Sequence, residues 1–176
     1  MRIIGGSHKG RRLIAPQSIP ARPTTDFAKE GLFNILQNRI DLTECDVLDL
    51  FCGIGGLSLE CSSRGARHVT CVDSNINAIR WMKKQSSEWA SNIQSHKMDA
   101  LKWLKRNDEK FDLVFADPPY AYTDYQVLVE AVLKNALKPN GLFVLEHRQS
   151  NTFAQDPRFI EDRTYGEVKF SFFEHV

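Results

Sequence analysis

The chain has 176 residues, a formal net charge of +1, and ordinary globular proportions of 42% hydrophobic and 26% charged residues. No apolar run approaches the roughly 20 residues that span a bilayer, and the start, MRIIGGSHKG, lacks the apolar core of a signal peptide. The 4 cysteines and 5 histidines are scattered, without the spacing of a disulfide framework or a zinc site. We therefore expect one cytoplasmic globular domain without a bound metal. A monomer is the expected oligomeric state.

Charge is distributed unevenly along the chain. The first 22 residues contain no acidic residue, and the rest of the chain has more acidic than basic residues; the basic residues at the start are Arg2, Lys9, Arg11, Arg12 and Arg22. A basic arm of this kind is typical of proteins that bind phosphates of nucleic acids. A solvated, frayed terminus is the alternative interpretation.

The first segment predicts a small β-ribbon. RIIGG and GRRLIAP are two short apolar runs joined through glycines, and each predicts a short strand. We treat residues 1–24 as a basic N-terminal extension and residues 25–176 as the main domain.

A helix is predicted next, over about residues 25–37. The proline and the cap-type hydroxyls of ARPTTD precede four apolar residues at helical spacing, Ala28, Leu32, Ile35 and Leu36. Gly31 lies within this helix and lowers its intrinsic stability.

From residue 46 onward, short apolar runs alternate with helical patterns. The predicted strands are DVLDLF, HVTCVD, IQSHKMD, FDLVFAD and LFVLEH, and the helices between them are GGLSLECSSRG, NAIRWMKKQSSEWA, ALKWLKR and YQVLVEAVLKNAL, which KPNG ends. Residues 158–175 predict two further strands around YGE, as a hairpin at the sheet edge. The series predicts an α/β fold with a doubly wound, mostly parallel, seven-stranded Rossmann-like sheet.

Ligands of such sheets bind beyond the carboxyl ends of the strands, where several acidic residues fall. Gly53 and Gly55 form a turn that lets the backbone approach a ligand, and Asp73 ends the next strand, where a carboxylate can accept hydrogen bonds from both ribose hydroxyls. Asp49 precedes the glycine turn and suits a cationic ligand better than a pyrophosphate. This favours S-adenosylmethionine over NAD. Asp99 then lies beside the adenine, caps the helix that follows it, or does both.

The fourth strand ends in FADPPYAYTDY. Adjacent prolines cannot donate to a sheet ladder, so the chain leaves the sheet in a fixed direction. We expect the Asp117 carboxylate and the Pro118 carbonyl each to accept one hydrogen of an exocyclic nucleobase amine, which turns its lone pair toward a methyl donor. Tyr120 would stack on the flipped base, a contact worth roughly 1–3 kcal/mol. The alternative is a turn whose aromatic ring packs into the core.

These motifs carry a resemblance to a known family. DLFCGIGGLSLE, VD and DPPY resemble the cofactor, ribose and target-base motifs of class I S-adenosylmethionine-dependent amino-methyltransferases. More narrowly, RIIGGSHKGRRL, RPTTDFAKEGLFNIL, LDLFCGIGGLSLECSSRGA and YGE resemble the bacterial methyltransferases that modify the N2 amine of one guanine in small-subunit (16S) ribosomal RNA. The resemblance extends from Arg2 to about Tyr165.

The resemblance implies S-adenosyl-L-methionine as cofactor, and 16S rRNA in the small ribosomal subunit or a late assembly precursor as partner. It implies a cofactor site made of Asp49, Phe51, Gly53, Gly55, Asp73 and Asp99, and a catalytic site made of Asp117, Pro118 and Tyr120. It further implies RNA contacts by Arg2, Lys9, Arg11, Arg12, Arg22, Thr24 and Thr25. Cys52 stands where alanine is usual in the family, and Asp73 stands where glutamate is frequent.

Other functions are compatible with parts of this pattern. An adenine-N6 methyltransferase acting on DNA or RNA, or a protein-amide methyltransferase, would use the same DPPY chemistry. An NAD-dependent dehydrogenase would share the glycine turn, but Asp49 and the lack of a placed acid/base histidine argue against it. A non-catalytic RNA-binding module would not need the three acids at the strand ends. We expect direct transfer of the methyl group without a covalent enzyme intermediate, with Cys52 as a packing residue.

Overall fold

The computed structural model describes residues 1–19, 24–89 and 91–175 of the chain. The helices of this part are α1 (Asp26–Leu36), the short 3₁₀ helix η1 (Leu42–Glu44), α2 (Gly56–Ser63), α3 (Ile76–Glu88), α4 (Ala100–Arg106) and α5 (Tyr125–Asn135). The strands are β1 (Asp46–Leu50), β2 (His68–Asp73), β3 (Ile93–Lys97), β4 (Phe111–Ala116), β5 (Leu137–Arg148), β6 (Phe159–Tyr165) and β7 (Val168–Glu174). None of the helices in the described part is long and apolar enough to cross a membrane.

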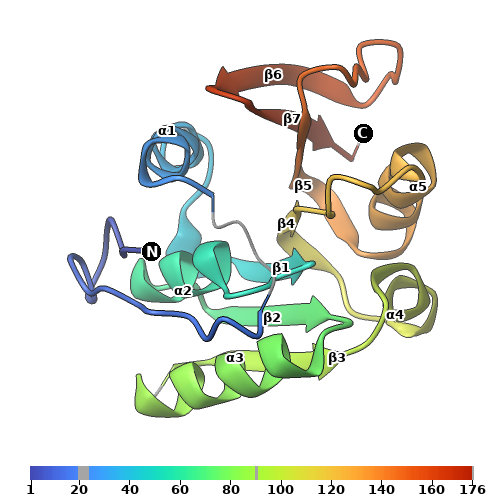
Figure 1. Cartoon of the computed structure of the whole chain (residues 1–176). Coiled ribbons are helices and arrows are strands. Elements are labelled where there is room, and N and C mark those ends of the chain that lie inside the picture. The colour runs from blue at the N-terminus through green and yellow to red at the C-terminus, as the bar shows by residue number, and fades with distance from the viewer. Residues whose placement is uncertain (20–23, 90, 176) are drawn as a thin grey trace.

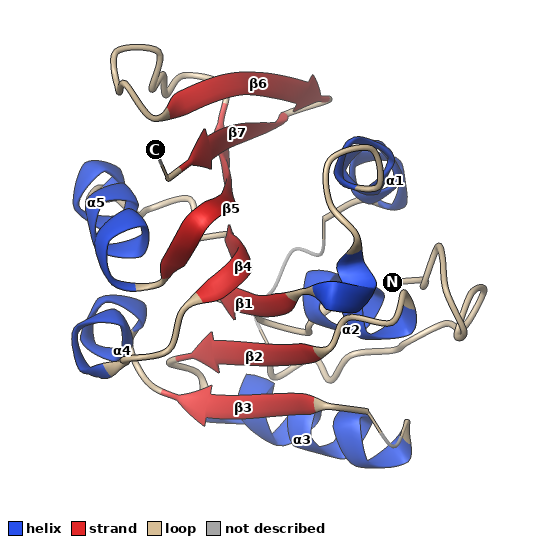
Figure 2. Cartoon of the chain, turned by 180° about the vertical axis from the view of Figure 1, so that it is seen from behind, coloured by secondary structure: helices blue, strands red, loops and turns tan. Residues whose placement is uncertain are grey.

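The strands form one seven-stranded sheet in the order β3-β2-β1-β4-β5-β7-β6. Strand β7 is antiparallel to both of its neighbours, β5 and β6, and the pairings among the other strands are parallel. Helices α1, α2 and α3 cover one face, and α4 and α5 cover the other (Figures 1 and 2). Strand β4 is buried because alternate residues enter the two cores: Leu113 and Phe115 face one, Val114 and Ala116 the other. The predicted doubly wound, mostly parallel sheet is confirmed.

The N-terminal segment is less regular than predicted. In place of two strands, one isolated antiparallel bridge joins Arg2 to Arg12, and the Ile3 N–H donates to the Arg11 carbonyl at 3.0 Å. The two runs therefore lie side by side as a ribbon, but they do not form a ladder.

A buried carboxylate explains the missing ladder. The backbone N–H groups of Ile4 and Gly5 donate to Glu60 at 2.9 and 2.7 Å. Because Ile3 already pairs with Arg11 and alternate residues face the partner strand, the Gly5 N–H is the next one needed and is unavailable for pairing across the ribbon. Lys29 lies 3.4 Å from the same carboxylate, and both side chains are fully buried. The Lys29 Nζ also donates to the Arg2 carbonyl at 2.5 Å. This ion pair joins the N-terminal segment to α1 and α2.

Helix α1 begins and ends close to the predicted positions. The Thr25 hydroxyl accepts from the Ala28 N–H at 3.1 Å and caps the helix. Gly31 has a packing role, because a Cβ added there would lie 2.2 Å from the Tyr165 ring. The YGE motif of the C-terminal hairpin therefore packs on α1.

We expect Gly31→Ala to lower the melting temperature, although alanine in a helix is ordinarily about 1 kcal/mol more favourable than glycine. The added methyl group overpacks against Tyr165, which typically costs roughly 1–3 kcal/mol. Thermal unfolding measures the effect, with Glu30→Ala on the exposed side of α1 as control. In a Tyr165→Ala background the same change should be stabilising. A higher melting temperature for the single variant would contradict this packing role.

Strand β5 differs from its prediction. It begins at Leu137 instead of Leu142, so KPNG lies within the strand and does not precede it. The pairing of β5 with β4 shifts register there, and Asn140 has a φ of 60°. The proline and the left-handed residue thus produce an irregularity in the strand without ending it. The predicted C-terminal hairpin is confirmed as β6 and β7, with β6 at the sheet edge.

Candidate active site

The order of the strands reverses between β1 and β4, which is the position where doubly wound sheets bind ligands. A cavity of about 680 Å³ lies there, a volume within the usual range for ligand sites. Every residue predicted for the catalytic and cofactor sites except Gly55 lines it: Asp49, Phe51, Gly53, Asp73, Asp99, Asp117, Pro118 and Tyr120. The residues predicted from separate motifs are thus brought together.

The glycine turn after β1 is built from left-handed backbone. Phe51, Gly53 and Gly55 have φ values of 61°, 53° and 75°, a region that favours glycine. Gly55 precedes the first residue of α2 and does not line the cavity. A Cβ on it would lie 2.1 Å from the Met82 sulfur, so this glycine is required by packing as well as by its φ.

Asp73 fixes the glycine turn. Its Oδ2 accepts from the Gly53 N–H at 2.8 Å, and its Oδ1 accepts from the Asn75 N–H at 2.7 Å. Each carboxylate oxygen has a second lone pair, so Asp73 can hold the turn and still accept hydrogen bonds from a ligand in the cavity. The 20-residue spacing of Gly53 and Asp73 therefore corresponds to a direct contact.

Asp49 is buried beneath the same turn. Its Oδ2 accepts from both the N–H and the hydroxyl of Ser58, at 3.1 and 2.5 Å. Burial raises the pKa of Asp49 to about 7, against the lowering effect of the Ser58 hydrogen bonds. A buried carboxylate of this kind gains most from a cationic ligand, which agrees with the prediction that Asp49 faces the charged methionine end of the cofactor.

Asp99 and Tyr122 lie on another part of the wall. Asp99 accepts from the Lys102 N–H at 3.0 Å and caps α4, so the predicted capping role is present. Tyr122 was not singled out from the sequence. Its ring packs edge-on against Phe51 with centroids 5.5 Å apart, and its buried hydroxyl has no hydrogen-bond partner among the described residues. Burial raises the pKa of Tyr122 to about 12.

The DPPY turn leaves β4 as predicted. The Asp117 N–H makes a last sheet bond to the Leu50 carbonyl at 3.3 Å, after which the two prolines follow. Among the described residues, the Asp117 carboxylate has neither a hydrogen-bond partner nor an ion-pair partner. Tyr120 is 43% exposed at the cavity, with the Arg148 guanidinium 4.6 Å from its ring centroid. The alternative of an aromatic ring packed into the core is wrong.

Glu146 is a cavity residue that the sequence reasoning missed. It lies on β5, one residue after Leu145, which pairs with Ala116; Glu146 therefore lies beside Asp117. It is 7% exposed, and its Oε2 accepts from the Thr24 hydroxyl at 3.0 Å. Burial raises the pKa of Glu146 to about 7. Burial also raises the pKa of Asp117, and the nearby Glu146 carboxyl adds to the effect.

The pKa of Glu146 predicts a stability effect. An acid with a pKa near 7 in the folded chain, against an ordinary 4.5, keeps a proton that the unfolded chain releases. This carboxyl therefore lowers stability as the pH rises from about 4.5 to about 7. Glu146→Gln cannot ionise, so we expect its melting temperature to exceed that of the wild type by more at pH 8 than at pH 5. Equal shifts at both pH values, or the same shifts in exposed Glu109→Gln, would contradict this.

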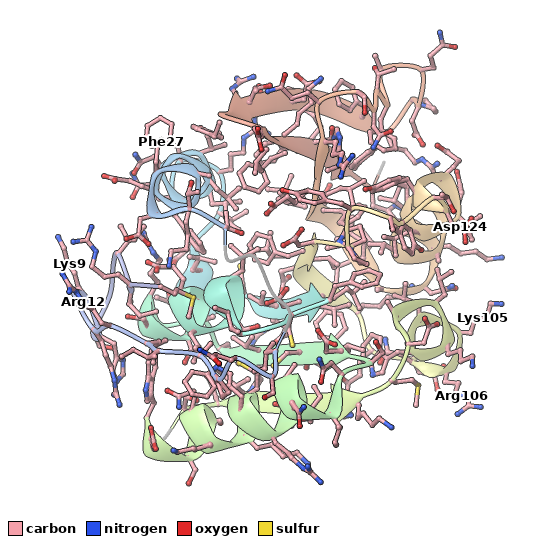
Figure 3. The ribbon with its side chains drawn as sticks, in the orientation of Figure 1. Lys9, Arg12, Phe27, Lys105, Arg106 and Asp124 are labelled. Carbon is pink, nitrogen blue, oxygen red and sulfur yellow. The ribbon has the colours of Figure 1, made fainter. Side chains whose placement is uncertain are left out.

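The predicted RNA-binding residues occupy different places. Figure 3 shows Lys9 and Arg12 pointing outward at one edge of the molecule, and β1, β2 and β3 run away from that edge (Figure 1). Arg2 lies 3.5 Å from Asp26, and Arg11 lies 4.0 Å from Glu88. The outer basic residues are thus on the side of the sheet opposite the carboxyl ends of these strands.

The RPTTD element divides between two roles. Thr24 lines the cavity through its bond to Glu146, whereas the Thr25 hydroxyl is used to cap α1. Arg22 lies outside the described residues.

The hydrogen-bond acceptors of the cavity fit S-adenosyl-L-methionine. Asp49, Asp73 and Asp99 supply acceptors, and that ligand presents donors or positive charge at its ammonium, ribose hydroxyls, adenine amine and sulfonium. The switch-point cavity and the acids at its strand ends define a class I methyltransferase, whose cofactor is S-adenosyl-L-methionine. The chain belongs to the family described as "Conserved hypothetical protein 95", which matches residues 1–174.

Individual relatives agree with this assignment. The ribosomal RNA small subunit methyltransferase D of Haemophilus influenzae is 33% identical over 184 residues, covering 99% of this chain and 94% of the relative. A putative rRNA methyltransferase of Bacillus subtilis is 36% identical over 153 residues, covering 84% and 82%. The solved structure of a putative methyltransferase from Escherichia coli has a TM-score of 0.85 and 28% identity, covering 99% and 97%. The resemblance to the small-subunit rRNA methyltransferases is confirmed at the level of the family.

Proposed function

We propose that this protein transfers a methyl group from S-adenosyl-L-methionine to the exocyclic N2 amine of one guanine in 16S rRNA. This is the guanine 966 type of reaction, carried out in the cytoplasm by a monomer on the small subunit or a late precursor. The observation that carries the proposal is the Asp117 carboxylate, which lies without a protein partner among the described residues in the cavity that Asp49 and Asp73 line. The names of the relatives supply the substrate class, small-subunit rRNA.

The chain's own residues would act mainly by positioning. The cofactor would supply an activated methyl group on a sulfonium and would leave as S-adenosylhomocysteine, while the methylated amine releases one proton. The Asp117 carboxylate and the Pro118 carbonyl each accept a hydrogen bond from the amine. In this orientation the nitrogen lone pair is no longer conjugated with the ring and points into the cavity. Tyr120 stacks on the base at the cavity mouth. Fixed geometry and exclusion of water then provide most of the rate enhancement, without a covalent enzyme intermediate.

A direct experiment tests this assignment. The protein is incubated with methyl-labelled S-adenosyl-L-methionine and, separately, with small subunits that lack the modification, naked 16S rRNA, DNA and protein. We expect label in the small subunit or its RNA, in one nucleotide that digestion identifies as N2-methylguanosine. Label in N6-methyladenosine, DNA or protein would support the other amino-methyltransferase functions, and no transfer to any substrate would support an RNA-binding module.

Residues 1–24 are proposed as an RNA-binding extension. Lys9 and Arg12 are exposed at its edge and form no ion pair among the described residues. We expect Lys9→Ala with Arg12→Ala to weaken RNA binding and to reduce the slope of log affinity against log salt by about 2, since each lost phosphate contact removes about one counterion. S-adenosyl-L-methionine affinity and the maximal rate should be unchanged.

The matched control for this pair is Lys105→Ala with Arg106→Ala, at the end of α4 on the other side of the molecule (Figure 3). Filter binding over a range of salt concentrations measures both double variants. If Lys9→Ala with Arg12→Ala leaves the salt slope unaltered, the N-terminal ribbon does not contact RNA phosphates through these residues and has a structural role only.

A further inference from the structure

The carboxyl groups of Asp117 and Glu146 both line the cavity, and the proposed reaction uses only that of Asp117. Ala116 of β4 is in register with Leu145 of β5, and both side chains enter the core under α4 and α5. The next residues, Asp117 and Glu146, therefore project from the opposite face of the sheet, and both line the cavity. Burying two acids together is unfavourable. Such an arrangement is expected where a ligand supplies the missing hydrogen-bond donors.

The orientation of Glu146 is fixed by one neighbour. The Thr24 hydroxyl donates to its Oε2 at 3.0 Å, and the side chain is 7% exposed. In the part of the chain that the structure describes, neither Asp117 nor Glu146 forms an ion pair. Glu146 thus has acceptor capacity beside Asp117 that no described cation uses.

We propose that Glu146 accepts the N1–H of the target base and thereby makes the site specific for guanine over adenine; this inference rests on the proposed function. The Watson–Crick edge of guanine presents three hydrogens on adjacent nitrogens, one on N1 and two on N2. The residues that line the cavity include three with acceptor groups for these hydrogens, Pro118 (its carbonyl), Asp117 and Glu146.

Adenine does not match these three acceptors. Beside its exocyclic amine it presents the lone pair of N1, which would face the Glu146 carboxylate. A buried acceptor placed against another acceptor loses its hydrogen bond and is desolvated without compensation. Glu146 therefore acts as a specificity-determining residue, and Thr24 positions it.

Nucleosides that differ only at the relevant edge test the inference by binding. Dissociation constants are measured calorimetrically at pH 8, where the Glu146 carboxyl is ionised, in the presence of S-adenosylhomocysteine for guanosine, inosine, 2-aminopurine riboside and adenosine. Inosine keeps N1–H without the 2-amine, and 2-aminopurine riboside keeps the 2-amine without N1–H. We expect the wild type to bind guanosine at least about tenfold more tightly than 2-aminopurine riboside, whereas weaker binding of inosine reports the loss of the amine contacts to Asp117 and Pro118.

Glu146→Gln should reduce that preference to near unity, because the glutamine amide can turn its NH₂ toward the unprotonated N1. The Thr24 hydroxyl can adapt, since it either donates or accepts. Glu109→Gln, an exposed change before β4, should keep the wild-type ratio. The thermal unfolding described above shows whether the Glu146 variant folds, and the wild-type comparison of guanosine with 2-aminopurine riboside tests the inference without any variant.

The outcomes separate this inference from the proposed function. A wild type that prefers guanosine over adenosine but binds 2-aminopurine riboside as tightly as guanosine would overturn the role of Glu146 alone. The same holds for a Glu146→Gln variant that keeps the full wild-type ratio. A wild type that prefers adenosine would overturn both.

Discussion

Asp117→Ala is expected to lose roughly 10²-fold or more in the rate of methyl transfer while its affinity for S-adenosyl-L-methionine stays close to that of the wild type. This is a typical loss for a polar group that is positioned at the reacting atoms. The carboxylate lies at the end of β4 in the cavity, and no described residue donates to it, so its removal should not break a structural contact. Single-turnover rates with saturating RNA and calorimetric cofactor binding measure the two effects.

Two further variants sharpen this result. Asp124→Ala changes an exposed aspartate in the same connection between β4 and α5 (Figure 3), and should keep the wild-type rate. Asp117→Asn retains a carbonyl acceptor, so we expect an intermediate loss. A wild-type rate of methyl transfer in Asp117→Ala would contradict the proposed role of the DPPY turn. An equal loss of rate in Asp124→Ala would show that the rate depends on the loop as a whole and not on the Asp117 carboxylate.

The second large effect is expected at Asp73. Asp73→Ala removes the acceptor for the Gly53 and Asn75 N–H groups, which are bonded at 2.8 and 2.7 Å. It also removes the acceptor proposed for the ribose hydroxyls. Hydrogen bonds to a charged group contribute about 1.5–3 kcal/mol each, and 1.4 kcal/mol corresponds to tenfold in affinity. We therefore expect a loss of about 10²-fold or more in S-adenosyl-L-methionine affinity, measured by calorimetry.

A structural effect at Asp73 can be distinguished from a ligand contact. S-adenosylhomocysteine and adenosine keep the ribose, whereas methionine lacks it. If Asp73 binds the ribose, Asp73→Ala should weaken both ribose-containing ligands and leave the affinity for methionine close to that of the wild type. Equal losses for methionine and for the ribose-containing ligands, or wild-type affinity for all of them, would contradict the assignment.

Much of the fold could be predicted from the sequence because its signals are local. Apolar runs of about six residues alternating with helical periodicity are sufficient to predict the parallel strands and the helices between them. The irregular parts depend on distant partners. The N-terminal runs form only a bridge because Glu60, more than 50 residues away, takes their N–H groups. Likewise, the packing role of Gly31 depends on Tyr165, from the other end of the chain.

In the candidate site, too, some residues could be predicted from local sequence signals and others depend on distant partners. Asp49, Asp73 and Asp117 end strands, and the topology of a parallel sheet brings strand ends together, so their meeting could be predicted. Glu146 could not be identified this way because it lies inside a strand pattern, in LFVLEH, where an acid next to a histidine carries no motif. Only its register with Asp117 and its bond to Thr24 place it in the cavity. The one sequence signal that could have pointed to Glu146 is that it is an acidic residue within an otherwise apolar strand.

The most direct test of the central claim is a crystal structure of the protein with S-adenosylhomocysteine and guanosine. The account predicts the guanine N2 within hydrogen-bond distance of the Asp117 carboxylate and the Pro118 carbonyl, with the homocysteine sulfur facing that nitrogen and Tyr120 stacked on the base. A guanine bound elsewhere, or a sulfur directed away from Asp117, would contradict it.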